Sequence, residues 1–441
     1  MTAEIALMNK EAIALAADSA VTMQTRSVSK IFSSANKIFM LSKYRPVGIM
    51  IYEDATFMGI PWEILIKTYR DLLGEKSFPT LEEYAKNFIE FLDKKNSLFP
   101  AKLQKDFLKG SIDLYFEFLN EQLFREIESI LKEKGILEEG EEDKIITGII
   151  TSIIKEQCSI WENGKQIPNI SDNFEKNFAD KFDKLIDKSL ANKFENILLS
   201  QEQKNQLKRL AVLSNCRYSN RMRSPTYSGV VIAGFGEKDI FPSLVSYIIE
   251  LVINNRLKYN NFGTTKITYD SGAAIIPFAQ REMVTTFMEG IDPDYMKIKD
   301  SYISQIFKKY PEMIVSHIKG YSESDKIELE NKLKEVGNEL LNDLKKKLSK
   351  YRTEHYSMPI INVVAGLPKD ELAKMAESLI SLTSFKRRVS PVNETVSGPI
   401  DVALISKGDG FIWVKRKHYF TYEMNPQFRD NYYRRCEENG D

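Results

Sequence analysis

The sequence is poor in cysteine, and its cysteines do not form a pattern. The 441-residue chain has three, and Cys158, Cys216 and Cys436 lie far apart without a Cys-x-x-Cys or Cys/His grouping. This spacing speaks against a disulfide framework and against a zinc site. Free thiols are typical of a reducing compartment, so we expect a cytoplasmic protein.

Histidine is equally scarce. His317, His355 and His418 each stand alone in the sequence. A histidine-based metal site or a Ser-His-Asp mechanism therefore has little to build on. We expect no metal and no other cofactor, and any catalysis has to use a different base.

The chain also lacks net charge and long apolar runs. Lys and Arg total 62, as do Asp and Glu, so neither nucleic acid nor an anionic membrane is an expected partner. No stretch approaches the ~18 apolar residues of a membrane span. Charged and polar residues such as Glu4 and Lys10 interrupt the start, so no signal peptide is expected. The 43% hydrophobic residues are enough for a sizeable core.

Short apolar runs predict strands at both ends of the chain and in its middle. Residues 3–8 and 12–17 flank a polar turn, as do 38–41 and 47–52, and each pair predicts a hairpin. Strands are also expected within 228–236 and 266–279. Near the end, "PIDVALIS" and "GFIWVKRK" predict one further pair.

Helical periodicity dominates the rest of the sequence. Apolar residues recur at three- and four-residue spacing from Pro61 to Leu73, with Gly74 as the expected end. Further helices are expected at 280–288 and in "PKDELAKMAESLISLTSF". Two longer segments, about 78–215 and 291–357, are rich in Lys, Glu, Leu and Ile, and their charge runs indicate solvated helix faces.

This order of elements predicts an α+β fold whose layered core is interrupted by large helical insertions. We expect residues 1–77, 224–290 and 358–425 to form the core. Residues 78–223 and 291–357 would be the insertions, and 426–441 a C-terminal tail.

Thr2 is the first candidate for chemistry. If Met1 is removed, Thr2 carries a hydroxyl and a free α-amine on adjacent carbons, which places a nucleophile beside its own base. The reference pKa of an α-amine is about 7.7–8.0, and a nearby ammonium lowers it. Threonine at this position is also common because small residues permit removal of Met1, so Thr2 alone does not indicate catalysis.

Several stretches in order resemble the proteasome-type amino-terminal nucleophile hydrolases, the family of proteasome β subunits and HslV peptidase. They are Thr2, "IALMNKEAIALAADS", "NKIFML" and "SGPIDVALISKGDGF". The resemblance implies a four-layer αββα core. It also implies a homo-oligomer, with an ATP-dependent unfoldase or another protein as a partner.

The same resemblance assigns roles to four further residues. Lys37 would be the lysine beside the Thr2 amine, and Asp18 the carboxylate that holds this lysine. Ser397 would hydrogen-bond the amine. Glu394, where the family usually has aspartate, would orient that network.

Each assignment has an alternative. Lys30 competes with Lys37, because "KIFSSANKIF" repeats Lys-Ile-Phe. Asp18 and Ser19 are also ordinary residues for the end of a strand. Ser397-Gly398-Pro399 is equally compatible with a plain loop before a strand.

Two departures from the family pattern concern the chemistry. Tyr52 and Glu53 stand where the family commonly has a Gly-Gly pair that supplies a backbone N–H to the oxyanion hole; any residue keeps that N–H. Pro277-Phe278-Ala279 replaces the usual Gly-Ser-Gly, and Asp270-Ser271-Gly272 is a weak substitute.

The leading hypothesis is a threonine-nucleophile amidohydrolase that acts on a peptide or protein substrate. One alternative is an inactive proteasome-like scaffold or regulatory subunit. Another is a small-molecule amidase of the wider superfamily.

Overall fold

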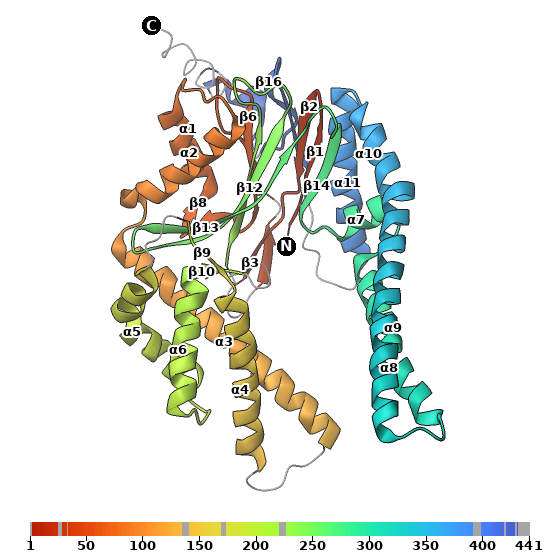
Figure 1. The fold of residues 1–441 in the computed structure, drawn as a ribbon. Coiled ribbons are helices and arrows are strands. Elements are labelled where there is room, and N and C mark those ends of the chain that lie inside the picture. Colours follow the sequence, from red (N-terminus) through yellow and green to blue (C-terminus); the bar gives the residue numbers. More distant parts are fainter. Residues whose placement is uncertain are drawn as a thin grey trace. The chain divides into compact units, whose positions relative to one another are not determined.

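The computed structural model describes residues 2–24, 29–32, 34–134, 141–168, 173–219, 226–390, 398–418, 420–427 and 430. The chain forms two compact units. Unit 1 comprises Met1–Ile38, Ile240–Pro242 and Lys266–Asp441, and unit 2 comprises Phe39–Asp239 and Ser243–Thr265. Each unit combines a five-stranded sheet with helices (Figure 1), so the mixed, antiparallel α+β character is confirmed. Among the described residues, no helix is both long and apolar enough to cross a membrane.

The sheet of unit 1 combines strands from early, middle and late parts of the sequence. Its strand order is β14-β1-β2-β15-β16, and each neighbouring pair is antiparallel. The strands are β1 (Ala3–Asn9), β2 (Ala12–Ala17), β14 (Ala273–Ala279), β15 (Asp401–Ser406) and β16 (Gly410–Lys415). The predicted hairpin at the start and the predicted pair near the end are therefore confirmed. An unpredicted small hairpin, β3 (Val21–Gln24) and β4 (Ser29–Phe32), follows β2.

Helices cover one face of this sheet. Helix α11 (Lys369–Val389) packs on β1, β2 and β15, and α10 (Met358–Ala365) packs on β1 and β14. Because strand residues alternate between faces, Ala3, Ile5 and Leu7 join the core under these helices and Glu4 points to the other face. Helix α7 (Glu282–Glu289) follows β14.

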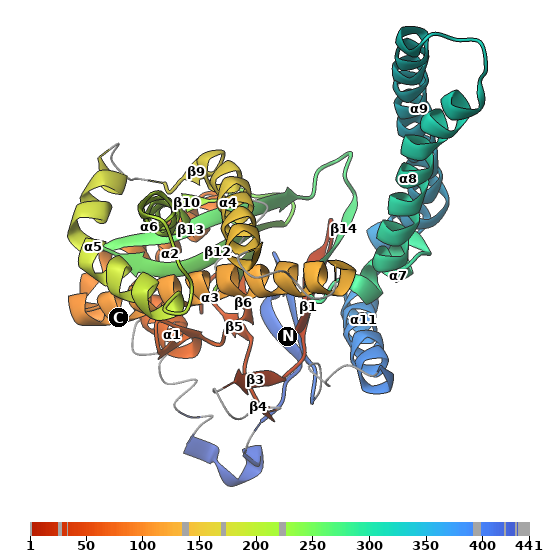
Figure 2. The same cartoon turned by 90° about the horizontal axis from the view of Figure 1, so that it is seen from below.

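The remaining helices of unit 1 form a long hairpin. Helices α8 (Pro293–His317) and α9 (Glu323–Arg352) lie side by side in both views of the fold (Figure 2), and a π-helical turn, η2 (Thr353–Ser357), links α9 to α10. Asp292 caps α8 and Ser322 caps α9 through bonds to backbone N–H groups in the first turn. The helical character predicted for 291–357 is confirmed.

The sheet of unit 2 has the order β13-β12-β11-β6-β5. Its strands are β5 (Ile38–Met40), β6 (Val47–Glu53), β11 (Ser228–Gly234), β12 (Ser243–Ile253) and β13 (Arg256–Lys266), and the short pair β7 (Thr56–Phe57) and β8 (Ile60–Pro61) follows β6. Of the strands predicted within 266–279, the structure has β14, while residues 267–272 between β13 and β14 form no strand. Strands β12 and β13 were not predicted. They are joined at Asn254 and Asn255, whose φ values of 51° and 62° suit a type I′ turn.

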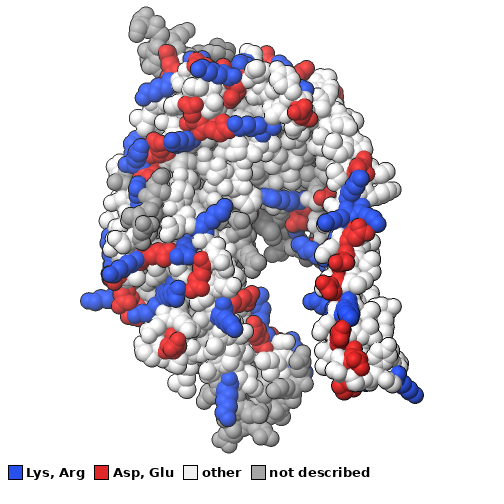
Figure 3. All heavy atoms as spheres, viewed as in Figure 1, with Lys and Arg blue, Asp and Glu red and all other residues white. Residues whose placement is uncertain are grey.

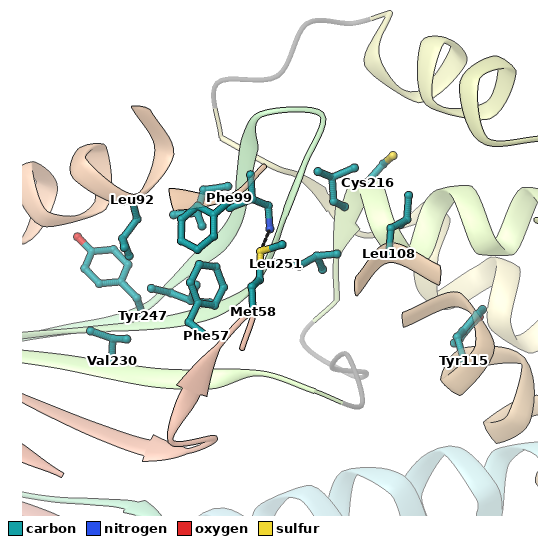
Figure 4. Packing of buried hydrophobic residues seen from close by; sticks show 14 of the residues in the cluster. Phe57, Met58, Leu92, Phe99, Leu108, Tyr115, Cys216, Val230, Tyr247 and Leu251 are labelled. Carbon is teal, nitrogen blue, oxygen red and sulfur yellow. Dashed lines mark hydrogen bonds between the residues drawn. The ribbon is translucent and has the colours of Figure 1, made fainter. Parts of the chain in front are cut away.

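Helices supply most of unit 2. They are α1 (Trp62–Leu73), α2 (Leu81–Lys94), α3 (Ala101–Lys134), α4 (Glu141–Glu162), α5 (Phe174–Lys193) and α6 (Gln201–Cys216), with the short strands β9 (Lys165–Gln166) and β10 (Arg217–Tyr218) between them. Helices α2 and α3 contact β12. Leu92 of α2 and Leu108 of α3 share a core with Tyr247 and Leu251 of β12 (Figure 4).

Candidate active site

Thr2 lies immediately before β1, and its side chain and backbone are both engaged. The hydroxyl donates a hydrogen bond to Glu4 Oε2 at 3.2 Å. The Thr2 carbonyl oxygen accepts a hydrogen bond from the Gln280 backbone N–H, also at 3.2 Å. Thr2 is only 2% exposed. The start of the chain is thus built into unit 1.

Asp18 connects the end of β2 to the start of β1. Its Oδ1 accepts hydrogen bonds from the Ala3 N–H at 3.0 Å and from Lys37 Nζ at 2.5 Å, and its Oδ2 accepts one from the Ala20 N–H at 3.1 Å. Because β1 and β2 are antiparallel and Glu4 pairs with Ala17, the residue after β2 meets the residues before β1. Local hairpin register therefore places this carboxylate beside Thr2.

Lys37 lies just before β5 and reaches the same cluster. Its Nζ is 2.5 Å from Asp18 Oδ1 and 3.2 Å from Glu4 Oε1, and the side chain is buried. The structure therefore brings Thr2, Asp18 and Lys37 together, as predicted. Lys37 is thus the lysine that contacts Asp18, while the alternative, Lys30, lies in β4.

Glu4 is a member of this cluster that the sequence reasoning missed. It lies between the Thr2 hydroxyl and the Lys37 ammonium and is 1% exposed. Burial raises its pKa to about 8; the Lys37 charge opposes this rise and the Asp18 charge adds to it. The available sequence signal was a single acidic residue within the otherwise apolar strand "AEIALMN".

The charge balance explains why Glu4 holds its proton. One ammonium, on Lys37, serves two carboxyl groups that are both buried. If both were ionised, one negative charge would remain uncompensated away from water, which is costly. Protonation of Glu4 removes that charge.

Ser19 links this cluster to the segment before β15. Its hydroxyl donates a hydrogen bond to the Pro399 carbonyl oxygen, and β15 pairs with β2 in a register that aligns Asp401 with Ala17. Glu394 and Ser397 lie outside the described residues. Pro399, two positions beyond Ser397, is therefore held beside the Asp18–Ser19 turn.

The end of β14 also contacts Thr2. Ala279 pairs with Ala3 and has a φ of +54°, a strained value for a residue with a side chain. Gln280, which donates its N–H to Thr2, accepts a hydrogen bond on its own Oε1 from Arg387 Nε at 2.7 Å. Pro277-Phe278-Ala279 thus ends beside Thr2, and the buried side-chain amide of Gln280 follows it.

The suggested substitute for that hydroxyl does not fit. Ser271 lies in the loop before β14, and Ala273 pairs with Asn9 at the far end of β1 from Thr2. Seven strand residues separate the ends, which corresponds to about 20 Å. Asp270-Ser271-Gly272 is therefore corrected to a loop remote from Thr2.

Tyr52 and Glu53, the candidates for the oxyanion hole, belong to unit 2. They end β6, where Tyr52 pairs with Gly229 and Glu53 pairs with Ser228. Tyr52 is buried, and Glu53 has a φ of +67°. Glu53 is thus, after Ala279, the second candidate residue with a strained backbone conformation.

The described part of the chain contains no group of three or more His, Cys, Asp or Glu side chains placed to hold a metal ion. No protein-family model matches the sequence, and no curated protein matches it either. The functional inference therefore depends on the geometry around Thr2 and on the motifs that carry the resemblance.

Proposed function

We propose that this protein is an amidohydrolase whose nucleophile is Thr2, and that its substrate is a peptide or protein. Removal of Met1 would activate it. The observation that carries the proposal is the cluster in which Thr2, Glu4, Lys37 and Asp18 are linked by contacts of 2.5–3.2 Å. Asp18 accepts a hydrogen bond from the Ala3 N–H, and Thr2 directly precedes Ala3. A terminal amine on Thr2 would therefore lie close to the Asp18 carboxylate.

The proposed reaction uses the amine as the base. Thr2 Oγ1 attacks the amide carbonyl carbon while its proton passes to the α-amine. The amine then returns the proton to the departing nitrogen as the C–N bond breaks, which leaves an ester on Thr2. Water hydrolyses this ester and regenerates the hydroxyl. The Lys37 ammonium favours the neutral amine, since like charges disfavour its protonation.

Glu4 would modulate this base. Its Oε2 already accepts the Thr2 hydroxyl hydrogen, and its raised pKa lies near neutrality, where a proton donor or acceptor works best. A proton shared between the amine and Glu4 keeps the buried site electrically balanced in either position. Glu4 is thus proposed as a group that exchanges a proton with the amine.

The resemblance supplies the remaining elements of the proposal. Backbone N–H groups near Tyr52 and Glu53 would stabilise the oxyanion, and Ser397 and Glu394 would support the amine. A four-layer αββα core is proposed on the basis that each unit by itself provides one sheet and a helical layer. We also propose an unfoldase partner and self-association. A cytoplasmic location is proposed because Cys158 and Cys216 are free thiols, which are typical of a reducing compartment.

A catalytically inactive scaffold or regulatory subunit is the second candidate. The near-complete burial of Thr2 favours it, because a nucleophile has to reach its substrate. The engagement of the hydroxyl by Glu4 points the same way.

Intact mass and hydrolysis assays separate these candidates. The purified protein should begin at Thr2 and cleave members of a panel of peptide and small acyl-amide substrates. Thr2→Ala should reduce turnover by at least about 10³-fold, whereas Thr2→Ser should retain part of it. Thr264→Ala, at an exposed threonine of β13, is the matched control.

Uniform retention of Met1, or equal hydrolysis by the wild type and Thr2→Ala, would overturn the proposal. A biological effect that survives Thr2→Ala would favour the scaffold. Cleavage of acyl amides alone would indicate the small-molecule amidase.

A further inference from the structure

The α8–α9 hairpin exposes an unusual amount of apolar surface. On α8 the exposed apolar side chains recur every three or four residues and include Tyr295, Tyr302 and Tyr310, at 62, 64 and 58% exposure. A row at this spacing forms a continuous stripe along a helix. We define the apolar face of the hairpin as Tyr295, Ile298, Tyr302, Ile306, Tyr310 and Met313 of α8 with Val336, Leu340, Leu344 and Tyr351 of α9, all exposed.

These two rows lie on the same side of the hairpin. The helices are antiparallel, as ion pairing of Lys334 with Glu312 near one end and contact of Arg352 with Met296 near the other show. Phe307 faces Gly337 across the contact. Each residue advances a helix by about 100°, so in antiparallel helices the residues just before the inward positions emerge on one common side. Those residues are Ile306 and Tyr310 on α8 and Val336 and Leu340 on α9.

The other side of the hairpin is polar, which shows that the asymmetry belongs to the hairpin as a whole. Most of its exposed residues are polar, with Ile327 of α9 as an apolar exception. The polar ones are Ser301, Gln305, Lys308 and Glu312 on α8 and Asn331, Asn338, Asn342 and Ser349 on α9. A hairpin exposed to solvent on both sides would have no physical reason to carry apolar residues on one side and polar residues on the other. The pattern is typical of a helical pair that buries one side against a partner.

The amount of surface is sufficient for a stable interface. An aromatic side chain offers ~150–250 Å², and most members of the apolar face are more than half exposed. The face therefore presents on the order of 1,000 Å², above the largest patches of typical monomers. It is comparable with the ~800 Å² that each partner contributes to a standard interface.

The charge distribution identifies the partner. The first half of α9 is acidic on balance, with Glu323, Asp325, Glu328, Glu330 and Glu335 against Lys326, Lys332 and Lys334. Its second half is basic on balance, with Lys345, Lys346, Lys347, Lys350 and Arg352 against Glu339 and Asp343. Figure 3 shows both signs along the hairpin, at the right of the view. A second hairpin related by a two-fold axis, with its helices running the opposite way, would place acidic halves against basic halves.

We propose that the apolar face of the α8–α9 hairpin binds the same face of a second copy of this chain, forming an antiparallel four-helix bundle. A two-fold interface is self-complementary by construction, and this face satisfies that condition in both apolar surface and charge. The proposal does not depend on catalysis, so Thr2→Ala leaves it unchanged.

The mass of the full-length protein in solution tests the proposal. Light scattering after size exclusion, over a range of concentrations, should give the mass of an assembly with at least two copies. The double variant Ile306→Glu with Leu340→Glu should be monomeric, because it buries charges in the interface. Gln305→Glu with Asn338→Glu, on the polar side of the same helices, should keep the wild-type mass.

Two further measurements keep the result unambiguous. Far-UV circular dichroism and melting temperatures establish that the variants are folded. Ile306→Cys, near the middle of the face, should be linked to a second copy by mild oxidation, whereas Tyr295→Cys, at one end, should not be linked above the wild-type level. A monomeric wild type, or an apolar-face variant with the wild-type mass, overturns the proposal.

Discussion

At the scale of single residues, Glu4 differs most from what its sequence context suggests. It is buried between a hydroxyl and an ammonium that Asp18 also binds. A carboxyl in this position is a cost to stability at neutral pH, since burial opposes its ionisation. Groups with strongly shifted pKa values occur both at functional sites and in structural ion-pair networks.

We expect Glu4→Gln to stabilise the protein increasingly as pH rises. The pKa of Glu4 is about 8 in the folded protein, against 4.5 for an ordinary glutamate, so between these values the folded state binds a proton that the unfolded state has released. Wild-type stability therefore falls as pH rises through this window. Melting temperatures from pH 5 to 8.5 should show the variant gaining at least about 2 °C relative to the wild type.

Glu11→Gln provides the control, because Glu11 is exposed in the adjoining turn. Its melting curve should follow that of the wild type across the same pH range. If Glu4→Gln gave a constant offset at every pH, the carboxyl would not be the titrating group.

At the scale of elements, the pairing of β6 with β11 depends on a glycine. Gly229 lies opposite Tyr52, and a Cβ at this position would overlap the Tyr52 ring. Tyr52 is only 2% exposed, so its ring is enclosed by the protein. This close approach fixes the end of β6, where Glu53 adopts its positive φ.

Gly229→Ala should therefore lower the free energy of unfolding by about 1–3 kcal/mol. Gly263→Ala on β13 should be almost neutral, because the nearest atom to its Cβ would be Ser246 Oγ at 3.8 Å. Urea titrations measure both. Adding Tyr52→Ala to Gly229→Ala should recover part of the loss; purely additive effects in this double-mutant cycle would refute the steric explanation.

At the scale of the whole molecule, the chain divides into two units with separate cores. The core of unit 1 lies between its sheet and helices α10 and α11, and the core of unit 2 joins its sheet to α1, α2 and α3. Separate cores favour separate cooperative transitions.

We expect calorimetry to resolve two unfolding transitions that respond to different substitutions. Asp18→Asn, in unit 1, removes the shortest contact of the buried Lys37 ammonium and should cost about 3 kcal/mol. It should lower one transition temperature, and Gly229→Ala, in unit 2, should lower the other. Asp71→Asn, at an exposed position of α1, should change neither. A single transition shifted by both variants would show that the units unfold together.

The local sequence pattern was sufficient to predict much of the secondary structure of this molecule. The first hairpin, helix α1, the hairpin pair β15–β16 and the charged helices α8 and α9 follow from periodicity and turn residues, because their hydrogen bonds join residues close in sequence. The same local register brings Asp18 back to the start of β1, so the Thr2–Asp18 relation was predictable. The Asn254–Asn255 turn was also a local signal, but the apolar run of β12 alone does not distinguish a buried strand from a helix.

Sequence alone determined which residues near the start of the chain can carry nucleophilic chemistry. Only the tertiary structure decided that Glu4 separates the Thr2 hydroxyl from Lys37, that Gln280 binds the Thr2 carbonyl, and that Ser271 lies too far away. These facts depend on β14 pairing with β1 across more than two hundred and sixty intervening positions, as Ala3 does with Ala279. Contacts between such distant segments are set by how the whole sheet packs and buries charge, which no local pattern encodes.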